Sequence, residues 1–177
     1  MTLLALAGCS AAEATPNPQA NAPAGAVAYP AGWKPLPAIA GAVAKAAAAD
    51  GVAIDRVEAW GDPAVGCYSV SLALHGGTAA APVLADQVLE SFQRVSRPRG
   101  GSLDGIELPR QADGVLAFRF TAAPYRGGVR ARLGNGRIAA IACFANQRAP
   151  LACEAACTGV LARLPGPAAS AAAGGAP

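Results

Sequence analysis

The 177-residue chain contains few of the residues on which enzymes and metal sites depend. Charged residues make up 14% of it and aromatic residues 5%, and His75 is its single histidine. No G-x-S-x-G or H-E-x-x-H pattern is present, so neither a nucleophile elbow nor a zinc-protease helix is indicated. We expect the glycine pairs at 76–77, 100–101 and 127–128 in loops, and the absence of a following Lys-Ser or Lys-Thr excludes a P-loop. The sequence therefore predicts no catalytic residue, no cofactor, no metal and no enzymatic activity.

Long apolar runs are missing as well. After Cys9 there is no stretch of about 18 apolar residues, which is the length that a membrane-spanning helix needs. The segments 10–32 and 165–177 are rich in Ala, Pro, Asn, Gly and Ser and hold almost no large apolar residue. Such segments cannot bury enough surface to offset the entropy lost on ordering, so we expect a disordered tether and a disordered tail. A single folded domain is predicted for residues 33–164.

The start of the chain carries a recognisable motif. Leu6-Ala7-Gly8-Cys9 follows a short apolar stretch and precedes the expected tether. These four residues resemble the lipobox of bacterial lipoproteins, although no Lys or Arg precedes the apolar stretch, as a complete signal peptide requires. The resemblance implies that residues 1–9 are a signal peptide and that Cys9 is acylated. It also implies a lipid-anchored protein of the bacterial cell envelope, in the outer membrane or on the periplasmic face. Ser10, in place of Asp, resembles the pattern that is not retained at the inner membrane of enteric bacteria.

Apolar spacing predicts an α+β domain. Helical spacing is found at residues 36–49, from near Thr78 to a stop at 97–101, and at 150–164. Strand-like alternation is found at residues 52–60, 67–74, 114–121, 129–133 and 137–144, and more weakly at 103–108. Gly134-Asn135-Gly136 indicates a tight hairpin, and the apolar run 138–144 indicates a central strand. We therefore predict a mostly antiparallel sheet of five or six strands with three packed helices.

The predicted order is helix, two strands, helix, three or four strands, helix. This order resembles the PsbP-like fold, which some bacterial lipoproteins of the DcrB type also have. The resemblance covers residues 33–164 and rests on element order, without a diagnostic residue motif. Proteins with that fold mostly bind partners rather than catalyse reactions, so the resemblance implies a binding module by analogy of fold.

The cysteines form the second informative pattern. Besides Cys9, the chain contains Cys67, Cys143, Cys153 and Cys157, and an even number in an exported domain predicts two disulfides. Cys153 and Cys157 lie one helical turn apart, and we expect each to pair with the sheet. Because Cys143 ends a strand shortly before the last helix, we predict the pairs Cys143–Cys153 and Cys67–Cys157. Buried free thiols are the alternative.

The same residues allow a hypothesis of metal binding. Cys143, Cys153 and Cys157, together with His75, are soft ligands of the kind that copper or zinc prefers. A Cys-x-x-x-Cys pair with a distant histidine resembles copper-delivery lipoproteins, but their thioredoxin-like order of elements is absent here. A carrier of a soft metal or a small ligand is therefore the alternative function.

Charge is distributed unevenly along the chain. The formal charge is −4 over residues 1–93 and +7 over residues 94–177. Arg130 and Arg132 are expected on one strand face, with Arg119 on an adjacent strand. Such a face could meet anionic lipid, a cell-wall polymer or an acidic protein, or it could simply be solvated. No stacking aromatics interleave with the arginines, so nucleic acid is not expected. The predicted function is a non-enzymatic envelope lipoprotein that binds an unidentified envelope protein or polymer.

Overall fold

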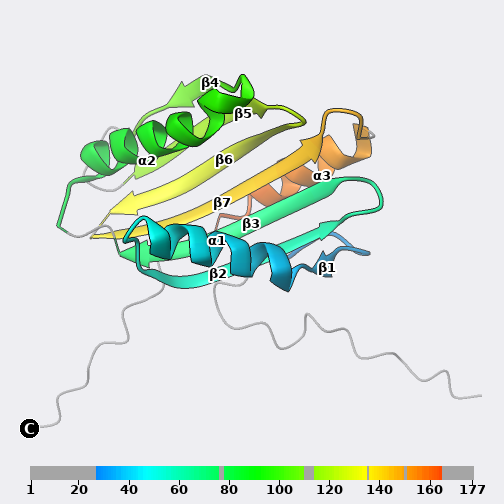
Figure 1. The fold of residues 1–177 in the computed structure, drawn as a ribbon, viewed down its shortest axis with the longest axis horizontal. Coiled ribbons are helices and arrows are strands. Elements are labelled where there is room, and N and C mark those ends of the chain that lie inside the picture. The colour runs from blue at the N-terminus through cyan, green and yellow to red at the C-terminus, as the bar shows by residue number, and fades with distance from the viewer. Residues whose placement is uncertain (1–26, 76–77, 110–113, 135, 150, 165–177) are drawn as a thin grey trace, which may run out of the picture.

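The structure is a computed structural model, and it shows one seven-stranded antiparallel sheet with three α-helices (Figure 1). The α+β class and the antiparallel sheet are thus confirmed. The sheet has seven strands rather than five or six because the two-residue strand β1 pairs with β2 at its edge. The predicted signal peptide with Cys9, the predicted tether up to residue 26 and the predicted tail lie outside the described residues. The structure describes residues 27–75, 78–109, 114–134, 136–149 and 151–164.

The elements follow the predicted order closely. Proline occupies the first turn of both α1 and α2, where its missing N–H group leaves no hydrogen bond unmade. A short 3₁₀ turn, Arg97–Arg99, ends α2 where the sequence predicted a stop. The elements are β1 (Lys34–Pro35), α1 (Pro37–Ala49), β2 (Ile54–Asp62), β3 (Cys67–His75), α2 (Ala81–Ser96), β4 (Ser102–Glu107), β5 (Gly114–Ala122), β6 (Tyr125–Gly134), β7 (Arg137–Asn146) and α3 (Leu151–Leu161).

The strands lie in the order β1-β2-β3-β7-β6-β5-β4. β7 is therefore the central strand, as its two apolar faces predicted. The hairpin between β6 and β7 is also confirmed, because Gly134 pairs with Arg137 across the turn. The loop predicted at residues 127–128 is wrong, since both glycines lie inside β6, opposite Phe144 and Cys143. The lack of a side chain at these two glycines allows close packing at the sheet and is not required for a turn.

Helices cover the sheet on both sides. In Figure 1, α1 and α2 lie in front of the sheet and α3 lies behind it. Because alternate residues of a strand point to opposite faces, each strand contributes to two cores. The α2 side buries an apolar cluster that contains Leu84, Ala85, Leu116, Phe118, Phe120, Val129, Ala131, Leu133 and Ile138. The other side, which we call the α3 face, buries Ile141, Cys143, Cys157 and Val160.

Residues before the predicted domain also pack on the α3 face. Val27 and Tyr29 are only 8% and 6% exposed. The Tyr29 ring stacks on Trp60, with 4.9 Å between ring centroids, and its hydroxyl lies 3.2 Å from the Ser71 hydroxyl. Packed structure therefore begins before the predicted boundary at Trp33. Two apolar residues in a proline-rich segment were too few to reveal this from the sequence.

Gly127 makes the tightest approach within β6, and its replacement tests the sheet packing. A Cβ atom at Gly127 would lie 2.4 Å from the Cys143 carbonyl oxygen and 2.6 Å from the Phe144 Cβ. Gly127→Ala should therefore lower the free energy of unfolding by about 1–3 kcal/mol, the usual cost of overpacking. Gly41→Ala is the matched control, because nothing lies within 4 Å of that position on α1. The control should stabilise slightly, and equal effects of the two changes in urea denaturation would contradict this packing.

Candidate functional site

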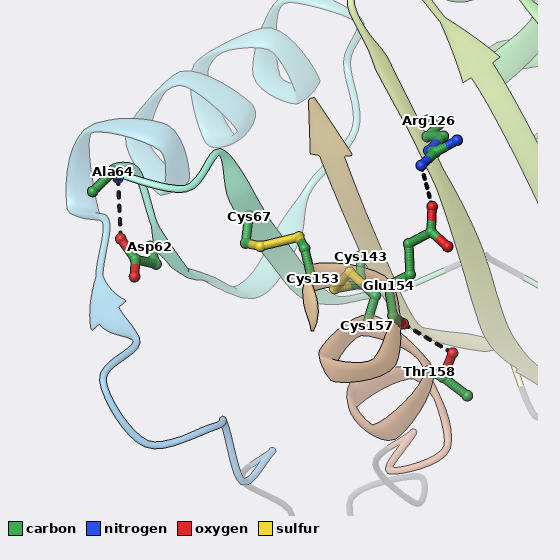
Figure 2. Close-up of a disulfide and its surroundings, with 9 residues drawn as sticks. All are labelled: Asp62, Ala64, Cys67, Arg126, Cys143, Cys153, Glu154, Cys157 and Thr158. Carbon is green, nitrogen blue, oxygen red and sulfur yellow. Dashed lines mark hydrogen bonds and ion pairs between the residues drawn. A yellow bond between two sulfur atoms is a disulfide. The ribbon is translucent and has the colours of Figure 1, made fainter. Parts of the chain in front are cut away.

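Two disulfides fasten α3 to the sheet (Figure 2). Cys67 at the start of β3 is bonded to Cys153, and Cys143 on β7 is bonded to Cys157. The Cα–Cα distances are 5.8 and 5.3 Å, within the usual range for a disulfide. All four cysteines are 8% exposed or less. The prediction that these cysteines form two disulfides is confirmed.

The predicted pairing, Cys143–Cys153 with Cys67–Cys157, is wrong. Cys67 lies opposite Ala145, two residues closer than Cys143 to the end of β7 where the chain turns toward α3. The first turn of α3 therefore brings Cys153 to the level of Cys67, and the next turn brings Cys157 to Cys143. Two strand residues span about 6.7 Å and four helical residues span about 6 Å, so the two bonds have nearly the same spacing along the sheet and along α3.

The three arginines selected from the sequence share the α3 face. Arg130 lies on β6 opposite Ala117 of β5, and Arg119 follows Ala117 by two residues. Arg132 follows Arg130 by two residues on β6. Residues two apart on a strand point to the same side, and residues that are paired across strands do so as well. The pairing of β5 with β6 therefore places all three arginines on one side of the sheet.

Ion pairs distinguish these arginines from one another. The Arg119 Nε atom donates to Asp104 Oδ1 at 2.6 Å, so its charge already has a partner on β4. Within the described ranges, Arg130 and Arg132 make no ion pair. Among the described residues, their guanidinium groups are therefore the charges of the predicted face that have no ion-pair partner. Three ion pairs engage other charged residues on or beside this face, namely Arg56–Glu58, Arg119–Asp104 and Arg126–Glu154, and His75 is hydrogen-bonded to Asp55.

A groove of about 340 Å³ lies on the α3 face, between α3 and the β4 edge. The Arg126–Glu154 pair connects β6 to α3 beside the second disulfide, as Figure 2 shows. Gly128 lines the groove, and Leu161 of α3 packs so closely over it that a Cβ there would approach Leu161 Cδ1 to 2.9 Å. The charged residues that line the groove are Asp104, Arg119, Arg126 and Glu154, two of each sign. The groove is therefore balanced in charge, and the excess positive charge lies outside it.

Burial of Tyr29 raises the pKa of its hydroxyl above 10.0, while the hydrogen bond with Ser71 acts in the opposite direction. The hydroxyl therefore stays protonated at neutral pH. This matters for the site because Tyr29 holds the first described residues against the α3 face. The aromatic stack of Tyr29 with Trp60 and Trp33 supports the same placement.

The ligands of the copper or zinc hypothesis do not meet in this structure. His75 lies at the opposite end of β3 from Cys67, a separation of roughly 26 Å along the strand. Its Nδ1 atom lies 3.0 Å from Asp55 Oδ1, and the four cysteine sulfurs are engaged in disulfides. In the part of the chain that the structure describes, no group of three or more His, Cys, Asp or Glu side chains could hold a metal ion. The carrier hypothesis stays a hypothesis that requires reduction of the disulfides first.

Comparison with known proteins assigns no family to this chain. No protein-family model and no curated protein matches the chain. Among the described residues, no helix is long and apolar enough to cross a membrane. The lipobox and the PsbP-like resemblance stay predictions.

Peptide mapping without reductant should recover Cys67 linked to Cys153 and Cys143 linked to Cys157. The two bonds close chain separations of 86 and 14 residues. In the chain-entropy model they stabilise by about 4.5 and about 3 kcal/mol, so replacing both Cys67 and Cys153 with Ala should cost more than replacing the other pair. The two double variants are matched controls for each other in denaturant unfolding. Equal losses, or recovery of a Cys143–Cys153 peptide, would contradict this arrangement.

Proposed function

We propose that this protein is a non-enzymatic lipoprotein of the bacterial cell envelope that is anchored through Cys9 and binds an anionic partner. The observation that carries the proposal is the placement of Arg130 and Arg132 side by side on the α3 face. Neither has an ion-pair partner among the described residues. The resemblance of Leu6-Ala7-Gly8-Cys9 to a lipobox supports the anchor.

The two guanidinium groups suit an anion. Arginine presents a planar set of donors that matches carboxylate and phosphate oxygens in a bidentate geometry. Residues two apart on a strand are separated by about 6.7 Å, so both groups can approach one partner. Arg130 lies between Ala117 and Ile141, and Arg132 lies between Val115 and Ala139, so a small alanine side chain leaves room on one side of each arginine.

The two arginines lie on a strand inside the sheet rather than on a loop, which favours binding. Both arginines are half-buried on β6, which is hydrogen-bonded on both sides, to β5 and β7. A side chain on such a strand has a fixed origin, so less conformational entropy is lost when a partner binds. The two disulfides support an exported location, because such bonds persist in oxidising compartments.

The proposal is tested with the full chain expressed in bacterial cells, so that it can reach the cell envelope. The wild type should fractionate with the membrane and carry a lipid on Cys9, and Cys9→Ser should abolish both. The double variant Arg130→Ser/Arg132→Ser should stay anchored but capture less of an anionic partner in pull-downs from the envelope. Arg119→Ser should matter less, because Asp104 already neutralises that guanidinium. Capture by the wild type should also weaken with added salt, since physiological ionic strength screens charges beyond about 8 Å.

The double variant Arg97→Ser/Arg148→Ser is the matched control. Both side chains are exposed, and the change removes the same charge from other parts of the surface. The control should capture the partner as well as the wild type does. Recovery of an unmodified Met1 in the cytoplasm would contradict the anchor, and capture that is indifferent to Arg130, Arg132 and salt would contradict the binding face.

A further inference from the structure

A third arginine lies beside the two that the sequence pattern singled out. Arg137 begins β7, and Arg132 of β6 pairs with Ala139, two residues further along β7. Arg137 therefore lies on the same side of the sheet as Arg132, on a diagonal of about 7–8 Å. Arg130, Arg132 and Arg137 thus share one region of the α3 face, which we call the arginine corner.

The arginine corner carries three positive charges, and none of their described cross-strand partners on β5 and β7, nor His75 opposite Arg137 on β3, is an acid. Within the described ranges, none of its three arginines makes an ion pair. On β2–β3, Asp55 is hydrogen-bonded to His75, which lies opposite Arg137. All three arginines are half-buried, so their stems are supported while their guanidinium groups keep access to solvent. Among the described residues, the corner is therefore a partly ordered basic surface without an ion-paired acid.

The chain enters the folded domain on this same side of the sheet. Val27 packs in one cluster with Ile141, and Ile141 is the pairing partner of Arg130. Tyr29 contacts Ser71, which is the partner of Ile141 on β3. The residues that connect the domain to Cys9 therefore join it on the face that carries the arginine corner. If the chain is anchored at Cys9, entry on this side brings the α3 face nearer to the membrane than entry on the α1 and α2 side would.

We infer that the arginine corner docks the domain onto the phosphate headgroups of the anionic lipid membrane that holds its own anchor. This inference rests on the proposed anchoring through Cys9 and names the anionic partner as the lipid surface itself. Guanidinium groups bind phosphate oxygens in pairs, and each basic residue near an anionic surface strengthens binding by about fivefold. Docking leaves the α1 and α2 side of the sheet turned away from the lipid.

The test uses the full chain with Cys9→Ser, so that no lipid anchor contributes to binding. Its partition is measured by co-sedimentation with phosphatidylcholine vesicles and with vesicles that also contain phosphatidylglycerol. The chain should bind the anionic vesicles and not the neutral ones. Replacing Arg130, Arg132 and Arg137 with Ser should reduce the partition on the order of 100-fold, because three basic contacts are lost. Circular dichroism should show an unchanged fold.

The matched control replaces Arg94, Arg97 and Arg148 with Ser, which removes the same charge from exposed positions outside the corner. It should retain most of the binding. Equal losses in the two triple variants would show attraction by net charge alone and would overturn the inference. Absence of vesicle binding would overturn it too. The proposed function would still stand if a soluble anionic envelope component were captured through Arg130 and Arg132, so the two failures are distinguishable.

Discussion

The pairing of β6 with β7 is the constraint on which the rest of the structure depends. Leu133 pairs with Ile138 on the α2 side, while Arg132 pairs with Ala139 on the α3 face. A slip of one residue would exchange these faces and send the arginines into the apolar core. Burial of Leu133 and its apolar neighbours on β6 therefore fixes the arginines on the opposite side. The position of the arginines on the α3 face thus follows from the burial of the apolar residues that alternate with them on β6.

The same pairing decides which part of the α3 face stays open. Cys143 lies on β7 opposite Gly128, where the absence of a side chain lets α3 pack closely. The disulfides hold α3 over this end of the sheet, with Cys157 bonded to Cys143. Arg132 and Arg137 lie toward the other end of β6 and β7. The helix α3 and the groove beside it thus occupy one part of the α3 face, and the arginine corner occupies another.

Much of this fold could be predicted from the sequence, because helical and alternating apolar spacing report directly on burial. The central strand and the hairpin at Gly134 followed from composition and turn chemistry. The disulfide pairing could not be predicted, since it depends on how far α3 returns along β7, which no local pattern encodes. Tyr29 was missed because its burial depends on Trp60, distant in sequence. Arg137 was missed because its face depends on the register across the turn.

The most direct test of this register is nuclear magnetic resonance of the isotope-labelled full chain. Cross-strand Overhauser contacts between backbone protons report which residues of β6 and β7 lie opposite each other. The register predicts contacts between Arg132 and Ala139 and between Arg130 and Ile141. Contacts from Arg132 to Ala140 in their place would reveal a one-residue slip. That result would remove the arginines from the α3 face and contradict the proposed binding surface.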